Sequence, residues 1–374
     1  DNSDKMRIGF DAKRFFNNAS GLGNYSRDLI RILSKFAPHN DYMLYTPNTS
    51  AEQYTNLVSR EQIRVPRGYI NQSFANLWRT KRIVSDLKKD QIAVFHGLSG
   101  EIPVDLTSAK IKSIVSMHDL IFMRYPSLYH PIDRWIYKKK FAHACRQSDK
   151  IVAISKQTKQ DIIEFFNIPE EKIDIIYQGC HEAFKIEKTD IEKEALKKRL
   201  GLPDEFLLNV GTIEERKNAL SIVKAIENID IPLVIVGRST KYQSQLQQFI
   251  SKHHMGDRVY FLSGLNMQEL SVLYSSALAF IYPSIYEGFG IPIIEALYSG
   301  TPVITTNSGV FPEAGGPFSQ YVSPHDIENM RHTIKTVIDD PMLRQEMRIK
   351  GLAHAQQFND EHLAQQWNEQ YQAL

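Results

Sequence analysis

Residues 283–296, PSIYEGFGIPIIEA, place two glutamates eight positions apart across a glycine-flanked turn that runs into an apolar helix. The preceding run, ALAFIY at 277–282, is short, apolar and aromatic, as in a buried parallel strand. Gly288 and Gly290 permit backbone conformations that other residues resist, and Pro292 suits the first turn of a helix. The sequence therefore predicts a strand, a tight turn and a helix, the unit from which parallel α/β sheets are built.

The same turn is the first candidate binding site. Backbone amides from Phe289 to Ile293 would face an incoming phosphate, which the dipole of the helix favours. Glu295, one turn inside the helix, can accept hydrogen bonds from two neighbouring hydroxyls, as on a ribose. Glu287 precedes the turn, beside whatever lies beyond the phosphates. The alternative is that Glu295 only complements the helix dipole and Glu287 is a solvated loop charge.

Length and composition indicate a two-domain globular protein. The chain has 374 residues, 42% of them hydrophobic and 24% charged, and this length exceeds what one hydrophobic core usually serves. We find no apolar run of the length that spans a bilayer and no signal-peptide core, and we expect residues 1–5 to form a loose terminus. Cys145 and Cys180 lack metal-site spacing, which favours a reducing cytoplasmic location.

Charge is unevenly distributed along the chain. Residues 1–185 hold 28 Lys and Arg against 20 Asp and Glu, a net +8, whereas residues 186–374 hold 17 against 23, a net −6. The first half contains basic clusters such as Lys138–Lys140. These clusters are candidates for peripheral contact with an anionic membrane face or with a phosphate-bearing acceptor. The alternative is a solvated helix face. No nucleic-acid partner is expected.

The first half alternates strands and helices. Residues 6–12 are predicted as a strand, and a loop containing Gly21 and Gly23 leads into an amphipathic helix to Phe36. This is half of a dinucleotide fingerprint, but Ser26 replaces the third glycine and no acidic residue ends the next strand, which excludes a nicotinamide site. A loop that brings backbone amides near a ligand is compatible with both observations.

The second half repeats the alternation after a charged segment, predicted as a linker. We divide the chain into a first domain (residues 1–185), the linker (186–200), a second domain (201–357) and a final segment (358–374). The predicted fold is α/β, with two doubly wound domains facing each other across a cleft. Ligands of such sheets bind beyond the C-terminal ends of the strands. The residues expected there are Gly21, Gly23, His118, Asp119, Gly211, Arg216, Lys217, Gly237, Glu287 and Gly288.

The segment GTIEERKN, residues 211–218, is the second candidate site. Arg216 and Lys217 lie close to the start of a predicted helix, where cations oppose the dipole. An anionic ligand would resolve that conflict, because Arg can bind a phosphate through two parallel N–H bonds and Lys adds a point charge. The alternative is an ordinary basic surface loop.

His118 and Asp119 end a predicted strand of the first half. The histidine can donate a hydrogen bond to a sugar hydroxyl or leaving oxygen, or transfer a proton, and a structural role is the alternative. Asp119 has no nearby carboxylate at the spacing of a metal motif, so neither a metal nor another cofactor is expected. Motifs of serine hydrolases, P-loop proteins and zinc proteases are absent from the sequence.

These motifs, taken in order, resemble the retaining glycosyltransferases of family 4, which have the GT-B fold. The resemblance runs through nearly the whole chain and is closest to bacterial mannosyltransferase-like members that build surface polysaccharides. The matching segments are GLGNY at 21–25, HD at 118–119, AISKQTKQDI at 153–162, GTIEERKN at 211–218 and YEGFGIPIIEALYSGTPVITTNSGVFPEAGG at 286–316.

The resemblance implies a role for each candidate residue. Glu295 would hold the ribose, Glu287 the transferred sugar, and Arg216 and Lys217 the diphosphate. The remaining implied donor contacts come from Gly21 and Gly23, His118, Gly211 and the amides of Phe289, Gly290 and Ile291. The final helix would pack on the first domain. The implied mechanism is metal-independent and retaining, with front-face attack in which the leaving diphosphate helps deprotonate the acceptor.

The expected function is transfer of a hexose from a nucleotide sugar to a saccharide or lipid-linked acceptor, with mannose from GDP-mannose as the first candidate. A nucleotide-sugar epimerase on the same scaffold and a non-catalytic nucleotide-sugar-binding subunit are the alternatives. One departure is that Gln178–His181 replaces the family's Asn-Gly-Val-Asp, so contacts from that segment are not carried over.

Overall fold

The computed structural model describes residues 5–49 and 51–374, and the chain divides into two compact units. The first unit runs to Gln178 and also contains Asp360–Leu374, and the second is Gly179–Asn359. Apart from Lys5, the predicted loose terminus lies outside the described residues.

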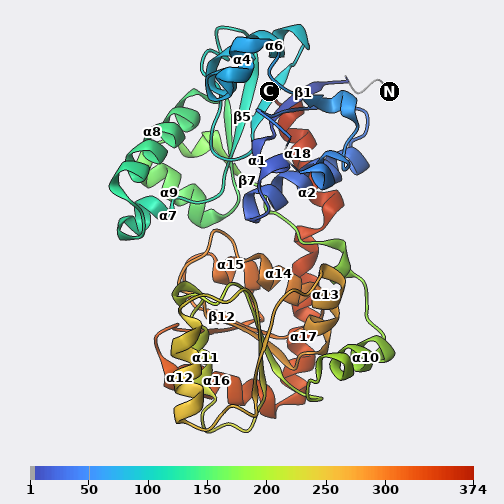
Figure 1. Ribbon diagram of the computed structural model, residues 1–374, viewed down its shortest axis with the longest axis vertical. Helices are drawn as coiled ribbons and strands as arrows, with labels where there is room; N and C mark the ends of the chain where they lie inside the picture. The colour runs from blue at the N-terminus through green and yellow to red at the C-terminus, as the bar shows by residue number, and fades with distance from the viewer. Residues whose placement is uncertain (1–4, 50) are drawn as a thin grey trace. The chain divides into compact units, whose positions relative to one another are not determined.

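The first unit is built on seven parallel strands in the order β3-β2-β1-β4-β5-β6-β7 (Figure 1). The order reverses between β1 and β4, which makes that point the topological switch of the sheet. The strands are β1 (Arg7–Asp11), β2 (Asp41–Tyr45), β3 (Ile63–Arg64), β4 (Val94–Gly97), β5 (Lys112–Met117), β6 (Lys150–Ala153) and β7 (Ile173–Ile175).

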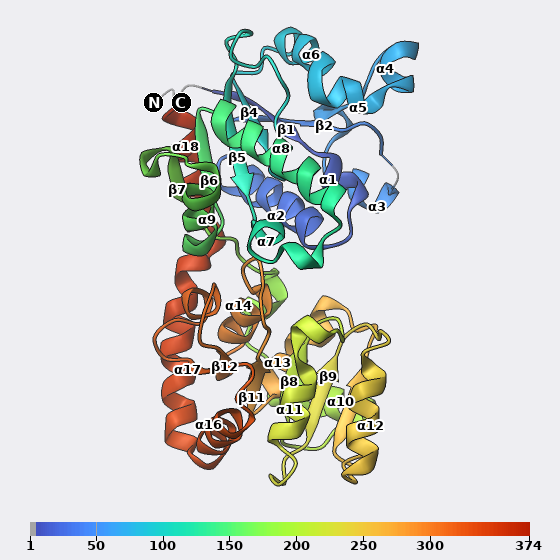
Figure 2. The same cartoon turned by 90° about the vertical axis from the view of Figure 1, so that its left-hand side faces the viewer.

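Helices cover both faces of this sheet because its central strands are apolar on both sides. Helices α6, α8 and α9 pack on the face that carries Phe95 and Val115, and α2 and α18 lie on the opposite face (Figure 1, Figure 2). The helices are α1 (Lys13–Asn17), α2 (Gly21–Phe36), α3 (Glu52–Thr55), α4 (Tyr69–Ser73), α5 (Ala75–Leu77), α6 (Ile83–Lys89), α7 (Ile121–Arg124), α8 (Pro131–Gln147), α9 (Lys156–Phe166) and α18 (Asp360–Gln372).

The C-terminal helix α18 is anchored in the first unit by buried aromatic side chains. Trp367 and Tyr371 are 1% and 0% exposed. The Trp367 ring packs on His96 at 4.6 Å, and the Tyr371 hydroxyl is hydrogen-bonded to His96 Nδ1 at 2.7 Å. Arg31 of α2 adds an ion pair with Asp360 at 3.1 Å. Helix α18 is therefore an integral layer of the first unit, although most of the chain separates it from the other elements.

The second unit has a six-stranded parallel sheet in the order β10-β9-β8-β11-β12-β13, with its switch point between β8 and β11. The strands are β8 (Leu207–Val210), β9 (Leu233–Val236), β10 (Val259–Leu262), β11 (Ala279–Tyr282), β12 (Val303–Thr306) and β13 (Gln320–Val322). The helices are α10 (Asp190–Leu200), α11 (Ala219–Ala225), α12 (Gln243–Lys252), α13 (Met267–Ser276), α14 (Ile291–Tyr298), α15 (Phe311–Gly315), α16 (Ile327–Asp339) and α17 (Pro341–Ala355). The prediction of two doubly wound α/β units is confirmed.

The predicted linker at 186–200 is wrong in its boundaries. Most of it is α10, which packs against α13 inside the second unit. Thr189 and Glu192 form a capping box at its start, and Gly201, with a φ of 66°, ends it. Leu196 is buried and Arg199 of α10 pairs with Glu269 of α13, so an apolar side chain, an ion pair and good capping together hold this highly charged helix in the fold.

Two local features of the first unit differ from regular helices and loops. Residues 75–89 are not one continuous α-helix, because α5 is followed by a π-helical turn, Trp78–Arg82, before α6. Gly21 and Gly23 do not lie in a loop but in the first turn of α2, which begins at Gly21.

Candidate functional site

The switch point of the second sheet brings the two candidate segments together. The loop after β8 contains Gly211 and the short 3-10 helix Glu215–Lys217, and the loop after β11 contains residues 283–290. Because β8 and β11 are adjacent parallel strands, their C-terminal loops emerge side by side. A backbone bond from Ile285 N to Arg216 O, 2.9 Å, joins them directly.

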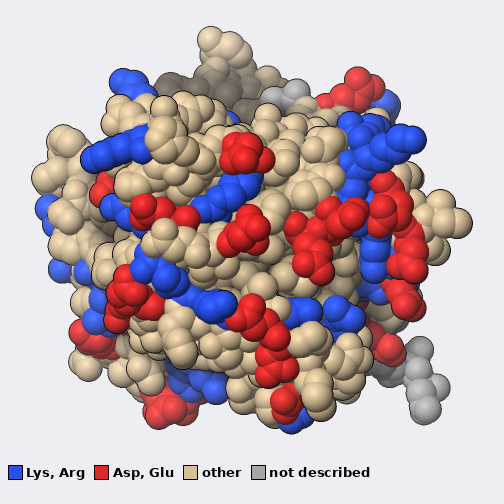
Figure 3. Space-filling model, turned by 90° about the horizontal axis from the view of Figure 1, so that it is seen from below, with Lys and Arg blue, Asp and Glu red and all other residues tan. Residues whose placement is uncertain are grey.

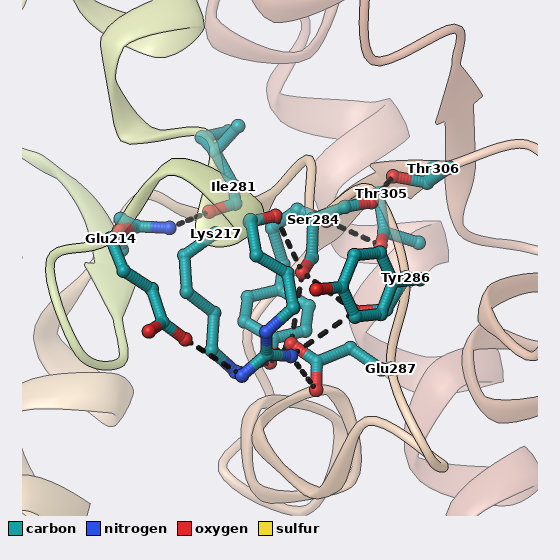
Figure 4. A network of polar contacts seen from close by, with 11 residues as sticks. Glu214, Lys217, Ile281, Ser284, Tyr286, Glu287, Thr305 and Thr306 are labelled. Atoms are coloured by element: carbon teal, nitrogen blue, oxygen red, sulfur yellow. Dashed lines mark hydrogen bonds and ion pairs between the residues drawn. The ribbon is translucent and has the colours of Figure 1, made fainter. Parts of the chain in front are cut away.

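Glu287 is the centre of the polar network that results (Figure 4). Its Oε1 accepts from Lys217 Nζ at 2.5 Å, from the Tyr282 hydroxyl at 2.8 Å and from Ser284 Oγ at 2.9 Å. Its Oε2 pairs with Arg216 Nη1 at 2.8 Å. The three charged residues that the sequence singled out separately are thus one ion-paired cluster, and both carboxylate oxygens of Glu287 are engaged.

Each cation keeps hydrogen-bonding capacity beyond this cluster. Lys217 Nζ donates to Glu287 and to the Tyr282 hydroxyl, 2.9 Å away, out of three N–H bonds. Arg216 also donates to Tyr286 O at 3.1 Å and pairs with Glu214 at 2.8 Å. Nε of Arg216 has no assigned partner among the described residues. The cluster can therefore bind an anion without losing its internal bonds.

Burial and charge act against each other on these groups. Burial alone would raise the pKa of Glu287, but Lys217 and Arg216 outweigh it and hold that pKa below its usual value. For Lys217, burial and the charge of Arg216 lower the pKa, and Glu287 opposes them. The Lys217 and Glu287 side chains are only 12% and 11% exposed, so each depends on the other for its charge.

Neutral side chains fix the loops that carry the cluster. Asn218 donates to Pro283 O at 3.0 Å and to Pro324 O at 2.8 Å, from a left-handed backbone with a φ of 62°. Thr306 of β12 donates to Ser284 O at 2.5 Å (Figure 4), and the Ser284 hydroxyl that donates to Glu287 also lies 3.2 Å from Arg216 O. Sequence reasoning missed Tyr282, Ser284 and Asn218; the only signal was the position of Asn218 between a loop and a helix, where asparagine tolerates a positive φ.

The turn after Glu287 starts α14 without a side-chain cap. Gly290 has a φ of 100°, a conformation that favours glycine, and Pro292 occupies the first turn as predicted. The Ile293 amide is taken by Gly290 O at 3.0 Å. Within the described residues, the amides of Gly290 and Ile291 have no hydrogen-bond partner, so they are the donors that this helix terminus offers.

Glu295, one turn further along α14, is electrostatically different from Glu287. Burial raises the pKa of Glu295 to about 7, and the nearby Tyr274 hydroxyl only partly offsets that effect. Its carboxyl group is therefore partly protonated at neutral pH, whereas Glu287 is fully charged.

A pocket of about 460 Å³ lies beyond the C-terminal ends of β8, β9 and β10. It adjoins the cluster through Gly211. The carbonyl oxygen of Gly211 lies so close to Gly237 that a Cβ on Gly237 would be 1.7 Å from it. Gly211 and Gly237 were expected at this edge, but the rest of the wall was not predicted because no motif marks it. The remaining lining is Val210, Thr212, Val236, Arg238, Ser239, Ser263, Gly264, Leu265 and Leu270.

One hydrogen bond sets the tautomer of His118 in the first unit. Its Nε2 lies 2.7 Å from the carbonyl oxygen of Leu98, so Nε2 carries the proton and donates it there. Burial lowers the pKa of His118 to about 4, against the effect of that bond. The ring is neutral at pH 7 and Nδ1 is left as an acceptor. Asp119 Oδ1 accepts from Ile121 N at 3.1 Å, at the start of α7.

Gly21 and Gly23 meet different surroundings. A Cβ on Gly23 would lie 1.9 Å from the carbonyl oxygen of Asn18, and its amide donates to Asn18 Oδ1 at 3.1 Å. A Cβ on Gly21 would meet nothing within 4 Å. Close packing on Asn18 is therefore sufficient to explain glycine at position 23, and only Gly21 leaves space for a ligand.

Residues 5–49 and 51–374 contain neither a metal-binding cluster nor a membrane-spanning helix. No group of three or more His, Cys, Asp or Glu side chains there is arranged to hold a metal ion. No helix in the same residues is both long and apolar enough to cross a bilayer. The face drawn in Figure 3 intermixes Lys and Arg with Asp and Glu, so charge on that face is balanced locally.

Comparison with known proteins matches both halves of the chain. A family model described as Glycosyltransferase Family 4 matches residues 19–184, and one described as Glycosyl transferases group 1 matches residues 190–353. O-antigen chain mannosyltransferase B of Escherichia coli is 25% identical over 99% of this chain and 100% of its own. O-antigen chain mannosyltransferase RfbU of Salmonella typhimurium is 33% identical over 60% of each chain. The structure of Anabaena HepE in complex with UDP superposes with a TM-score of 0.80 at 16% identity, over 99% and 100% of the two chains.

Fold, site and comparisons thus define a glycosyltransferase with two Rossmann-like units, the GT-B architecture. The chain belongs to glycosyltransferase family 4, the glycosyl transferases group 1. The prediction of the family and of a hexosyltransferase is confirmed, and the comparisons give no support to the epimerase or the non-catalytic subunit.

The Glu287 cluster predicts a specific stability effect. Replacing Glu287 with Gln removes the only carboxylate paired with the largely buried Lys217 among the described residues and leaves Arg216 with Glu214 alone, so the free energy of unfolding should fall by about 3–5 kcal/mol. The matched control is Glu214→Gln, which removes a 39% exposed partner of the same arginine and should cost less than about 1 kcal/mol. Urea unfolding followed by far-UV circular dichroism measures both; equal losses would show that burial of the cluster is unimportant.

Proposed function

We propose that this protein is a retaining mannosyltransferase that moves mannose from a nucleotide sugar, GDP-mannose first among candidates, to a saccharide or lipid-linked acceptor in surface-polysaccharide synthesis. The observation that carries the proposal is the ion-paired Arg216–Lys217–Glu287 cluster at the switch point, beside the uncapped start of α14. The curated relatives support the sugar, since both are named mannosyltransferases.

The diphosphate of the donor binds at the cluster and at α14. Arg216 and Lys217 supply charge-assisted hydrogen bonds, and the amides of Gly290 and Ile291 add donors at the positive end of the helix dipole. The amide of Phe289, whose ring is buried, continues this line toward the sugar. Gly211 leaves the backbone after β8 open to the phosphates.

Glu287 acts mainly by positioning the transferred sugar. Its Oε1 accepts three hydrogen bonds and is saturated, whereas Oε2 is engaged only by Arg216. A hydroxyl of the transferred sugar therefore bonds to Oε2. The ribose bonds to Glu295, and the base occupies the pocket beyond β8, β9 and β10.

Transfer then needs charge stabilisation more than a strong protein base. The bond from the anomeric carbon to the diphosphate oxygen breaks, the acceptor oxygen bonds to that carbon on the same face, and the acceptor proton passes to the leaving diphosphate. Arg216 and Lys217 stabilise the charge that develops there. Neutral His118 accepts a hydroxyl hydrogen bond of the donor sugar through Nδ1. No metal takes part in the proposed reaction.

A donor screen tests this function. Thermal shift with GDP-, UDP- and ADP-sugars should single out GDP-mannose, because a ligand at 100 times its dissociation constant adds about 2.7 kcal/mol of stability. Release of GDP should follow and should be unchanged by EDTA. The variant Arg216→Ala/Lys217→Ala should lose turnover by about 100-fold or more. Absence of stabilisation and turnover with every nucleotide sugar would refute the proposal.

Glu295 predicts a pH dependence of nucleotide binding. Ribose hydroxyls donate to a carboxylate, and the pKa of about 7 means that the protonated form dominates at lower pH. Affinity for GDP should therefore fall by about tenfold from about pH 8 to about pH 6, following the fraction of carboxylate. The affinity of Glu295→Gln for GDP, measured in parallel by calorimetry, should vary with pH only through the ionisation of the nucleotide phosphates. An identical pH dependence of affinity in both proteins would show that Glu295 does not bind the ribose.

The first unit also carries a candidate membrane surface. On α4 and α5, Tyr69, Ile70, Phe74 and Leu77 are 83%, 55%, 61% and 45% exposed, and Arg67, Lys81 and Arg82 are close in sequence. Exposed aromatic and aliphatic side chains beside cations are typical of peripheral contact with anionic lipid. We place membrane contact, on the cytoplasmic side, at this surface.

Vesicle sedimentation tests the contact. Binding to phosphatidylglycerol-containing vesicles should exceed binding to pure phosphatidylcholine vesicles and should decrease with salt. Binding should fall at least about tenfold in Ile70→Ser/Phe74→Ser, because each apolar side chain that enters the lipid contributes roughly 1.5–3 kcal/mol. Met342→Ser, which removes an 84% exposed apolar side chain from the second unit, is the control. Equal sedimentation of all three proteins would contradict this placement.

A further inference from the structure

A chain of four buried polar side chains crosses the face of the first sheet that α2 and α18 cover. The Tyr371 hydroxyl of α18 lies 2.7 Å from His96 Nδ1, and His96 Nε2 lies 2.7 Å from Ser116 Oγ. Ser116 Oγ lies 2.9 Å from the hydroxyl of Tyr25, in α2. His96, Ser116 and Tyr371 are 0% exposed and Tyr25 is 6% exposed. None of the roles proposed above involves this polar chain, which joins the last helix of the sequence to the beginning of α2.

The number of protons gives the polar chain one direction. Burial lowers the pKa of His96 to about 3, so at neutral pH one ring nitrogen donates and the other accepts. The four groups carry one proton each for three hydrogen bonds, so one proton has no partner within the chain. An unpaired buried donor is costly, and the cost is smallest on Tyr25, the only one of the four with exposed surface. Tyr371 therefore donates to His96 Nδ1. Nε2 in turn donates to Ser116, whose hydroxyl donates to the Tyr25 oxygen.

Tyr25 connects the polar chain to His118. The two rings meet edge to face, with centroids 4.4 Å apart and planes at 86°, a geometry that aromatic pairs favour. The bond from His118 Nε2 to Leu98 O fixes one atom of the imidazole, and Thr158 Oγ1 donates to the His118 carbonyl oxygen at 3.0 Å. Neither bond prevents the ring from tilting about Nε2. The Tyr25 ring does, so it determines the direction in which Nδ1 points.

Polar side chains are an expensive way to fill this layer of the fold. Phe10 and Trp367 pack on His96 in the same layer, and apolar side chains throughout would avoid the desolvation cost. A fully bonded polar network adds direction, because its hydrogen bonds hold each ring in one orientation. The orientation of Tyr25 is thus fixed from α18 through three bonds.

We propose that Tyr25 is a positioning residue for His118 and that the polar chain extends this support from Tyr371 of α18. The chain holds the Tyr25 ring against the imidazole, so that Nδ1 keeps the direction in which it accepts a hydroxyl hydrogen bond of the donor sugar. The inference rests on the proposed function, which assigns that bond to His118. In this role neither tyrosine needs to contact the sugar.

Three hydroxyl deletions separate positioning from packing. Tyr25→Phe and Tyr371→Phe each keep the ring and remove one end of the polar chain. Tyr42→Phe is the matched control, because Tyr42 is 4% exposed and donates to Ala37 O at 2.6 Å. Its ring packs on Phe10 with centroids 6.0 Å apart, as the Tyr371 ring does at 6.3 Å. All three variants lose a buried hydrogen bond, but only two of them alter the polar chain.

The NMR signals of the His118 imidazole report its orientation without any ligand. These signals depend on the ring current of residue 25, which phenylalanine largely preserves. In the full chain with isotope-labelled histidine, Tyr25→Phe and Tyr371→Phe should move the His118 signals in the same direction, and Tyr42→Phe should leave them at the wild-type position. His118→Gln assigns the signals. Unmoved His118 signals in Tyr371→Phe would overturn the proposal, and this variant decides the outcome if Tyr25→Phe fails to fold.

Affinity for two ligands provides the functional readout, because GDP-mannose presents the sugar that His118 contacts and GDP lacks it. Tyr25→Phe should weaken GDP-mannose binding by about tenfold, as expected for one misdirected hydrogen bond, and leave GDP binding unchanged. Tyr371→Phe should show a smaller loss of the same kind. An unchanged ratio of the two affinities in Tyr25→Phe, or the same selective loss in Tyr42→Phe, would overturn the positioning role. Failure of the donor screen leaves the NMR readout intact, so the two proposals fail separately.

Discussion

The second unit is organised around the requirement that Lys217 and Glu287 cannot be buried separately. A largely enclosed ammonium or carboxylate is expensive without a partner, and here one carboxylate serves both Lys217 and Arg216. The pair in turn fixes the loops after β8 and β11, since a shift of either loop would separate the charges. Asn218 and the amide of Ile285 tie the same loops through backbone carbonyl groups. These bonds hold the two loops in one arrangement, which would reduce the entropy lost when a ligand binds there.

The two units apply the same topology to different chemistry. Each sheet reverses strand order once, and each has polar groups in the loops at that point. In the second unit the groups converge on donors for an anion, through Arg216, Lys217 and free amides. In the first unit Asp11, Arg79, Glu101 and Lys140 form a chain of ion pairs whose four charges cancel. The same topology thus places N–H groups suited to an anion at one switch point and a charge-balanced chain of ion pairs at the other.

The sequence predicted the elements of the fold better than the contacts of the site. Apolar runs such as 277–282 and the Gly-Pro start of α14 are local signals, and they located the sheets and the main turn. The pairing of Lys217 with Glu287 spans 70 positions and depends on adjacency of β8 and β11, which no local pattern encodes. The tautomer of His118 is set by the Leu98 carbonyl oxygen. The need for glycine at position 23 comes from the close approach of the Asn18 backbone. Strands β3 and β13, of two and three residues, are too short to have a periodicity.

Charge balance explains why the donor site needs so many directed hydrogen bonds. Without the three carboxylates of α18, which belongs to the first unit, residues 186–359 hold 17 Lys and Arg against 20 Asp and Glu, a net −3, so the overall field of the second unit does not attract an anionic donor. Within the cluster, Arg216 and Lys217 are already matched by Glu214 and Glu287. A diphosphate therefore finds little net positive charge, and its attraction must come from N–H groups at short range. The uncapped start of α14, with Gly290 in a conformation that a side chain would strain, supplies those groups. The conformation of Gly290 therefore contributes to the proposed phosphate site together with the two cations.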